Sequence, residues 1–171
     1  MHKTIISIIS DTHGVLDKSV EQYLCKSDIV IHAGDVMSID LIKKLKTNYK
    51  KTYIVAGNND IPERYEHTND KEVINNLKKI ENIKIFDDTI TVTHGDQFGN
   101  MPSHSELRNN FPDSKLIIYG HTHYQIFDDS ESPWVMNPGA SGHTRNMNGG
   151  PCFSQVHIDN GLWSIKQYCF N

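Results

Sequence analysis

The chain has 171 residues, of which 37% are hydrophobic and 22% charged, and its formal net charge is -4. This length and balance are typical of one soluble globular domain, and they exclude a disordered chain. The apolar runs are too short to cross a bilayer, so no membrane partner is expected. Because no basic surplus exists, long nucleic acid is not expected as a substrate. We therefore treat residues 1–171 as a single domain.

The N-terminal segment predicts a strand and an intracellular location. Thr4 to Ser10 is an apolar run of strand length that continues into Asp11-Thr12-His13 without a small-residue cleavage site. We therefore expect a cytoplasmic protein. Three cysteines, an odd number, lie far apart at Cys25, Cys152 and Cys169. This pattern fits neither a disulfide framework nor a metal knuckle, so reduced thiols are predicted.

The first half of the chain alternates predicted strands with predicted helices. Ile- and Val-rich runs at Thr4 to Ser10, Asp28 to Ala33 and Thr52 to Ala56 favour strands buried on both faces. Apolar residues recur at helical spacing between Leu16 and Leu24, and Ser38 is predicted to cap a second helix. This β-α-β-α-β order predicts parallel strands whose following loops gather at one edge of the sheet.

The second half changes to an antiparallel pattern. A hairpin is predicted over residues 84–94 with its turn at Asp87-Asp88, and Ser103 has capping-box spacing to Glu106, which predicts a short helix. Further strands are predicted at residues 115–119 and 134–136, and a second hairpin is predicted over residues 153–168. The chain is therefore predicted to be α/β with an antiparallel second part.

Five predicted strands end in residues that bind metals. The endings are Asp11-Thr12-His13, Gly34-Asp35, Gly57-Asn58-Asn59-Asp60, His94-Gly95-Asp96 and Gly120-His121-Thr122-His123. One such ending alone is ordinary turn chemistry, but five at one edge of a sheet predict a site. In extended backbone, residues two apart point the same way, so Asp11 with His13, and His121 with His123, are expected to converge on one centre.

The candidate ligands offer carboxylate, amide and imidazole groups and no thiolate. They are Asp11, His13, Asp35, Asn58, His94, His121 and His123. This set suits Mn²⁺, Fe²⁺ or Zn²⁺ and is too rich in nitrogen for calcium. Seven ligands exceed the needs of one ion with open positions, whereas two ions about 3.5–4 Å apart would use them all. We predict two divalent ions, with Mn²⁺ favoured and Zn²⁺, Fe²⁺ or Ni²⁺ as alternatives.

The other histidines are expected to be surface or core residues rather than ligands. They are His2, His32, His67, His104 and His157. The role of His143 is left open. It follows the loop at residues 137–141, and Arg145 nearby is a candidate phosphate contact, although a simple turn explains this loop equally well.

The series of strand endings resembles the calcineurin-like metallophosphoesterase superfamily, and its order and short length are similar to those of small bacterial and archaeal phosphodiesterases. Residues 10–141 carry the likeness, with Asn137-Pro138-Gly139 included. The resemblance implies an α/β fold of two stacked mixed β-sheets flanked by helices, a four-layer αββα sandwich. It also implies one metal held by Asp11, His13, Asp35 and His123, and a second held by Asp35, Asn58, His94 and His121. Asp35 would then bridge the two ions.

The same resemblance implies hydrolysis of small phosphodiesters by a hydroxide that bridges the two metals. Asp35, Asn58 and Asp60 would be the catalytic residues, with Asp60 orienting the loop that carries Asn59. Many members of the superfamily carry a histidine that assists the leaving group where this chain has Asn59. An amide cannot act as a general acid, so Asn59 is expected only to donate a hydrogen bond to a phosphate oxygen.

Three alternatives to a phosphodiesterase are left open. A retromer subunit of the same fold is a protein-interaction scaffold and also lacks the histidine, but a scaffold has no need for seven competent ligands. A nuclease would need a basic groove with exposed aromatic residues, and a phosphomonoesterase would use the same two-metal chemistry.

The oligomeric state is also left open. Trp163 and Tyr168 on the C-terminal hairpin could pair two copies of the chain into a homo-oligomer.

Overall fold

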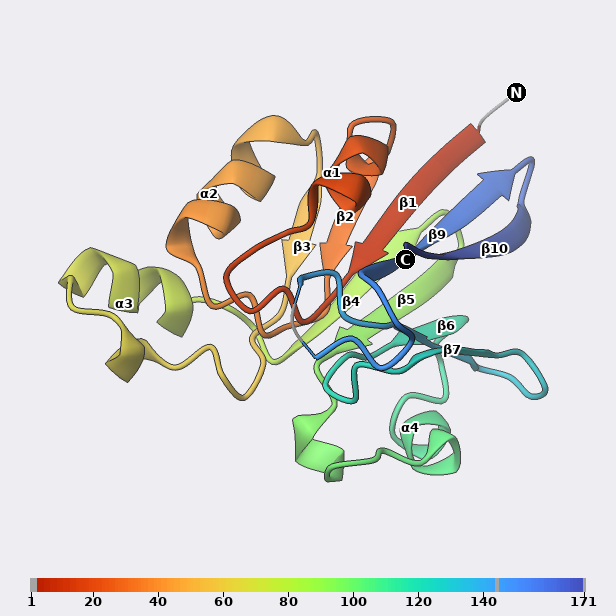
Figure 1. Ribbon diagram of the computed structural model, residues 1–171. Coiled ribbons are helices and arrows are strands. Elements are labelled where there is room, and N and C mark those ends of the chain that lie inside the picture. Colours follow the sequence, from red (N-terminus) through yellow and green to blue (C-terminus); the bar gives the residue numbers. More distant parts are fainter. Residues whose placement is uncertain (1–2, 144, 171) are drawn as a thin grey trace.

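Two five-stranded sheets form the framework of the protein in a computed structural model that describes residues 3–143 and 145–170 (Figure 1). The first sheet has the strand order β10-β9-β1-β2-β3, and the second has the order β4-β5-β6-β8-β7. The strands of the first sheet are β1 (Lys3–Ile9), β2 (Ile29–His32), β3 (Thr52–Ile54), β9 (Cys152–Asp159) and β10 (Leu162–Cys169). Those of the second are β4 (Ile80–Ile85), β5 (Asp88–Thr93), β6 (Leu116–Ile118), β7 (Gln125–Asp128) and β8 (Trp134–Pro138).

Both sheets are mixed. In the first, β1, β2 and β3 are parallel and β9 runs antiparallel to β1 and to β10. In the second, β5, β6 and β8 are parallel, and the edge strands β4 and β7 are antiparallel to their neighbours. The predicted β-α-β-α-β start and both predicted hairpins are confirmed, although the first hairpin turns at Phe86-Asp87 rather than at Asp87-Asp88.

Helices cover the outer face of each sheet, which completes the four layers predicted from the resemblance. The helices are α1 (Lys18–Leu24), α2 (Ile39–Asn48), α3 (Thr68–Asn75) and α4 (His104–Asn110), with short 3-10 turns η1 (Pro62–Arg64) and η2 (Asp96–Phe98). Figure 1 shows α1 and α2 beside the first sheet and α4 at the opposite side of the molecule. Buried side chains of α1 and α2 pack on β1 and β2, whereas Leu107 of α4 packs on β6 and β8.

The main core lies between the two sheets. Fully buried residues from both sheets meet there, such as Ile6 and Ile31 from the first and Ile90 and Leu116 from the second. Burial of Ile-rich strands on both faces removes a large apolar area from water, which is the main stabilising contribution to a fold of this kind. This core holds the C-terminal ends of β1, β2, β5 and β6 in fixed relation.

Local capping signals place the helix starts as the sequence predicts. The Ser38 hydroxyl accepts a hydrogen bond from the Leu41 backbone N–H, and the Ser103 hydroxyl accepts one from Glu106 N–H, both at 3.2 Å. Besides the two 3-10 turns, one helix and one strand were not predicted. Helix α3 buries only Ile74, and the edge strand β7 carries no fully buried residue, so neither has a strong apolar pattern.

The prediction that all three cysteines are reduced is wrong for two of them. Cys152 and Cys169 form a disulfide between β9 and β10, and Cys25 is free and exposed. The two cysteines are 17 residues apart in sequence, but the hairpin register sets them directly opposite each other. Sequence spacing was therefore a poor guide to their distance.

In the part of the chain described, no helix is both long and apolar enough to span a bilayer.

Candidate metal centre

The seven candidate ligands all follow the C-terminal ends of strands, and backbone contacts bring these ends together from both sheets. In the first sheet, the Asp11 N–H donates to the carbonyl of Gly34, at 3.0 Å. In the second, the Gly120 N–H donates to the carbonyl of His94, at 2.9 Å. The sheets meet where the His121 backbone N–H donates to Oδ2 of Asp11, at 3.1 Å. Parallel strands thus deliver distant parts of the sequence to one edge, as predicted.

Asp11, His13 and His123 form the first ligand group. The Nε2 atoms of His13 and His123 are 3.1 Å apart, and His123 Nε2 is 3.3 Å from Oδ1 of Asp11. One donor atom from each residue lies within 4.8 Å of the other two. A carboxylate oxygen and two imidazole nitrogens at this spacing suit a transition-metal ion.

Asp11, Asp35 and His94 form the second group. His94 Nε2 lies 3.5 Å from Oδ2 of Asp35 and 3.9 Å from Oδ1 of Asp11. The two groups therefore share Asp11, whereas the resemblance implies Asp35 as the bridge between the ions. That assignment of Asp35 stays a prediction. The carboxylates of Asp11 and Asp35 both lie within 4.8 Å of the donor atom of His94, so both belong to the second group.

Asn58 and His121 lie beside the second group and contact each other. Oδ1 of Asn58 is 3.1 Å from Nδ1 of His121, and the His121 ring packs edge-on against the His94 ring with centroids 5.2 Å apart. The structure therefore brings Asp11, His13, Asp35, His94 and His123 into two tight groups. It holds Asn58 and His121 next to them at the more exposed rim.

Two buried polar atoms at the centre have no hydrogen-bond partner among the described residues. They are Oδ1 of Asp11 and Nε2 of His94, and both side chains are completely buried. An unpaired buried polar atom is costly and is rare in folded proteins. Both atoms belong to the kinds that coordinate divalent metals. The chemistry of these residues therefore fits a metal ion.

Backbone carbonyls orient two of the histidines toward this centre. Nδ1 of His94 donates to the carbonyl of Ala33, and Nδ1 of His123 donates to the carbonyl of Arg145, each at 2.8 Å. Such a bond fixes which nitrogen carries the proton and leaves Nε2 free to coordinate. Arg145 thus contributes through its backbone, while its exposed side chain adds positive charge near His13.

Most of the candidate metal-binding residues have a left-handed backbone conformation rather than an extended one. The φ angles of Asp11, His13, Asp35, His121 and His123 all lie between 45° and 68°. The argument that residues two apart converge because the backbone is extended was therefore wrong, although the side chains do converge. Left-handed φ is costly for residues with a Cβ, and it persists where surrounding structure enforces it, often at functional sites.

Glycines allow the ligand loops to approach each other closely. Gly34 has a left-handed φ of 97°, and a Cβ at this position would run into the imidazole ring of His94. A Cβ at Gly57 would overlap the carboxylate and backbone nitrogen of Asp35. The glycines found beside these ligands in the sequence therefore have a steric reason to be there.

Burial and neighbouring charge shift the pKa values of the central residues in opposite directions. Burial opposes ionisation of Asp35, but the charge of His94 and hydrogen bonds from Asn59 outweigh it and hold the pKa of that carboxyl well below its usual range. Burial likewise disfavours the His94 cation, but the carboxylates of Asp35 and Asp11 raise the pKa of His94 to about 9. Burial lowers the pKa of His32 to about 3, which keeps this core histidine neutral.

Asp60 organises the site without pointing into it. Its carboxylate accepts hydrogen bonds from the backbone N–H groups of Gly57, Val36 and Met37, at 2.8 to 3.1 Å. These groups belong to the loops that carry Asp35 and Asn58. Asp60 therefore joins the two loops, and its catalytic role stays a prediction.

Asn59 is held firmly on Asp35. Its backbone N–H and its side-chain Nδ2 donate to the two carboxylate oxygens of Asp35, at 2.8 and 2.7 Å. Its Oδ1 accepts a hydrogen bond from Arg64, at 2.9 Å. Arg64 was not predicted as a site residue, because an arginine in a polar segment has no pattern that marks it as functional.

The other histidines mostly match expectation. His32 is buried in the core, His67 is exposed at the start of α3, and His157 is partly buried on β9. His104 lies 2.6 Å from Asp128, which places it in a polar cluster away from the ligands. His143 pairs with Asp17 at 3.0 Å and joins neither ligand group, while His2 lies outside the described residues.

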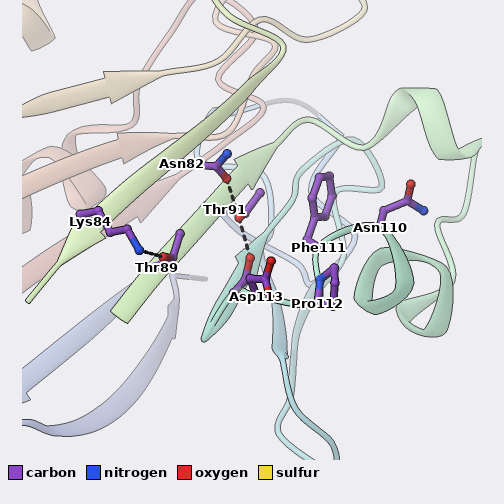
Figure 2. A pocket seen from close by; sticks show the side chains of 9 residues that line it. Asn82, Lys84, Thr89, Thr91, Asn110, Phe111, Pro112 and Asp113 are labelled. Carbon is purple, nitrogen blue, oxygen red and sulfur yellow. Dashed lines mark hydrogen bonds between the residues drawn. The ribbon is translucent and has the colours of Figure 1, made fainter. Parts of the chain in front are cut away.

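The cavity shown in Figure 2 lies apart from this site. A cavity of about 330 Å³ lies on the outer side of the second sheet, between β4, β5 and the segment after α4 (Figure 2). Thr91 is hydrogen-bonded there to Asn82 and to Ser114, and Lys84 donates to Thr89. This cavity contains none of the seven candidate ligands. The metal chemistry is therefore identified by its donor atoms and not by the size of a pocket.

Known proteins share both the sequence pattern and the fold. The family model of the calcineurin-like phosphoesterase superfamily domain matches residues 5–161. A phosphodiesterase of Methanocaldococcus jannaschii is 30% identical over 78% of this chain and 82% of its own length. A probable metallophosphoesterase of Mycoplasma pneumoniae is 26% identical over 98% of each chain.

Solved structures add evidence on the fold. Vacuolar Protein Sorting 29 from Cryptosporidium parvum superposes with a TM-score of 0.77 at 20% identity over 99% of each chain. An archaeal phosphodiesterase superposes with a TM-score of 0.71 at 25% identity, over 98% of this chain and 100% of the other. The sequence match over most of the domain, together with the fold, shows that this chain belongs to the calcineurin-like phosphoesterase superfamily.

Proposed function

We propose that the protein is a metal-dependent phosphodiesterase that hydrolyses small phosphodiesters at a centre of two divalent metal ions. The observation that carries this proposal is the pair of unpartnered buried atoms, Asp11 Oδ1 and His94 Nε2, each bordered by further metal-binding side chains. Burying such atoms without partners makes physical sense if ions complete their coordination.

The proposed ligand sets are those that the resemblance implies, and they differ from the two groups in sharing Asp35 rather than Asp11. Asp11, His13 and His123 would hold one ion with Asp35, and Asp35 would share the second with Asn58, His94 and His121. The mixed oxygen and nitrogen donors favour Mn²⁺, with Zn²⁺, Fe²⁺ or Ni²⁺ as alternatives. Ions of this kind supply an activated water at neutral pH and neutralise charge on the phosphoryl oxygens.

The chain's own residues would prepare this chemistry. His94 and His123 are oriented by the carbonyls of Ala33 and Arg145, so their Nε2 atoms need no rearrangement to bind. Asp60 links the loop that carries Asp35 to the loop that carries Asn58 through its hydrogen bonds. Asn59 cannot supply a proton to the leaving group, so diesters with good leaving groups are the preferred substrates.

A diester preference is supported by similarity to the phosphodiesterase of M. jannaschii. The competing proposal, a protein-interaction scaffold, draws on the fold that the chain shares with Vacuolar Protein Sorting 29. That likeness, at 20% identity, concerns the fold alone. A scaffold also gives no account of the unpartnered atoms at the centre. The nuclease and phosphomonoesterase alternatives predict other preferred substrates. Comparing the hydrolysis of different substrates therefore distinguishes them from our proposal.

The test is hydrolysis of bis-p-nitrophenyl phosphate and p-nitrophenyl phosphate by metal-stripped protein that is re-supplied with Mn²⁺, Zn²⁺, Ni²⁺ or Mg²⁺. An Asp35→Asn variant, checked for folding by circular dichroism, is the control. Metal-dependent turnover that is lost in the variant, with the diester preferred, supports the proposal. A preference for the monoester assigns a phosphomonoesterase, and no turnover with any ion favours the scaffold. Cleavage of long single-stranded DNA in preference to both small esters assigns a nuclease.

A further inference from the structure

The exposed guanidinium of Arg64 lies at the rim of the metal centre on the side of Asp35. The turn η1 begins with Pro62 and carries Arg64 back over the loop that follows β3. There Nη2 donates to Oδ1 of Asn59 at 2.9 Å, and Nη1 lies 4.0 Å from the sulfur of Met37. One residue, Asn59, therefore separates Arg64 from the Asp35 carboxylate.

Met37 connects Arg64 to the other ligand group as well. Its sulfur is 3.1 Å from Nδ1 of His13 and 4.0 Å from Nη1 of Arg64. Met37 is partly exposed and has a left-handed φ of 56°, so its loop is held in an uncommon conformation beside the site. Arg64 thus lies one side chain away from both groups.

The positive charge of Arg64 is not neutralised within the structure. No carboxylate of the described residues lies within ion-pair distance of it, whereas Arg108 pairs with Asp128 at 2.9 Å. A guanidinium has five N–H donors, and the bonds to Asn59 and Met37 use two of them. Donors remain for an anion, and the planar group can bind two phosphate oxygens at once.

The contacts of Asn59 determine how its side-chain amide is oriented between Asp35 and Arg64. Its Oδ1 faces a group that can only donate, and its Nδ2 faces a carboxylate that can only accept, so the amide orientation is unambiguous. Arg64 is thereby tethered over the centre rather than free to sweep through solvent. A tethered side chain loses less conformational entropy when it binds a ligand.

We propose that Arg64 is a substrate-binding residue that contacts the phosphate group of the ester. This inference rests on the proposed function, since it concerns the same centre. Arg64 would then bind the phosphate of the substrate on the side of the metal centre where Asp35 lies. Arg145, predicted from the sequence as a phosphate contact, would act near His13 and His123.

The test compares Arg64→Ala, Arg64→Lys and Lys43→Ala in metal-loaded protein. Lys43 is the matched control because it is an exposed cation on α2 whose ion pair with Asp70 is 3.9 Å long. Calorimetric titration with inorganic phosphate measures anion binding without turnover, and titration with Mn²⁺ measures metal binding. We expect Arg64→Ala to weaken phosphate binding by about tenfold or more and to raise KM for the diester, with Mn²⁺ affinity unchanged. Arg64→Lys should recover part of the loss, and Lys43→Ala should change neither value.

Two outcomes would overturn the proposal. One is unchanged phosphate affinity and KM in Arg64→Ala. The other is a loss of Mn²⁺ affinity in Arg64→Ala that matches the loss in Asn59→Ala, because Arg64 would then only position Asn59 on Asp35. Failure of the proposed function looks different: the wild-type protein itself would lack metal-dependent turnover, whatever the Arg64 variants do to phosphate binding.

Discussion

Oδ1 of Asp11 and Nε2 of His94 face each other at 3.9 Å in the interior, and neither has a hydrogen-bond partner among the described residues. The two residues are far apart in sequence and come from different sheets. Their meeting depends on the core that packs the two sheets together. A bound ion would complete the coordination of both unpartnered atoms, which leads to the first prediction.

Divalent metal should stabilise the protein, and this effect should require His94. At an ion concentration of about 100 times Kd, binding to the folded state adds roughly 2.7 kcal/mol to the free energy of unfolding. Thermal unfolding in EDTA and in Mn²⁺ measures the effect. His94→Ala should lose most of the increase in Tm, whereas His67→Ala, which changes an exposed histidine outside the site, should keep it. An undiminished increase in His94→Ala would exclude His94 as a ligand.

Gly57→Ala should damage the site by steric overlap alone. Gly57 does not have a left-handed φ, but an added Cβ would meet the Asp35 carboxylate. We expect a loss of about 1–3 kcal/mol in the free energy of unfolding and a severe loss of metal-dependent turnover. Urea denaturation and the diester assay measure these two quantities.

Gly161→Ala is the contrasting variant for this steric effect. Gly161 has a φ of 81° and no atom within 4 Å of an added Cβ. It should therefore lose stability through backbone strain, by about 1–2 kcal/mol, and keep its turnover. Equal turnover in the Gly57 and Gly161 variants would contradict the crowding argument.

Asn59→His should extend the range of substrates to poorer leaving groups. An imidazole can donate a proton to the leaving oxygen, which the amide cannot. We expect the ratio of alkyl to activated aryl diester turnover to rise in Asn59→His but not in Asn59→Gln, which has no titratable group. If the histidine variant gains nothing on alkyl diesters, the absence of an acid does not limit this enzyme.

Asp128 should contribute stability that depends on pH. Its carboxylate accepts hydrogen bonds from Ser130 and His104 and pairs with Arg108, and these contacts lower the pKa of Asp128 well below its usual range. A carboxyl whose pKa is lower in the folded state stabilises the protein above its unfolded pKa, and this contribution is lost as pH falls toward the folded pKa.

Asp128→Asn should therefore cost about 1–3 kcal/mol at pH 7, because the amide cannot accept from all three partners. The difference from wild type should shrink steadily below about pH 4, where the unfolded carboxyl takes up a proton. Urea denaturation across this range measures both effects, with Asp129→Asn as the control. A difference that does not depend on pH would show that Asp128 acts through packing rather than charge.

Much of the fold was predictable because its signals are local. The Ile-rich runs of β1 and β2 and the capping serines Ser38 and Ser103 specify their own conformations within a few residues. The candidate ligands were predictable for a related reason: each lies directly after a strand, and parallel strands end at one edge. Weak patterns were missed, as in β7, because an edge strand has less apolar surface to bury.

The sequence by itself determined the strand order of the first half and the α/β class. It also determined the types of residue that follow the C-terminal ends of the strands. Only the tertiary structure decided which of these residues meet. It paired Asp11 with His94 across the two sheets, set Cys152 opposite Cys169, and folded Arg64 back onto Asn59. The physical reason is that local propensities act over a few residues, whereas these contacts join residues from separate elements that only the packed core and the sheet register bring together.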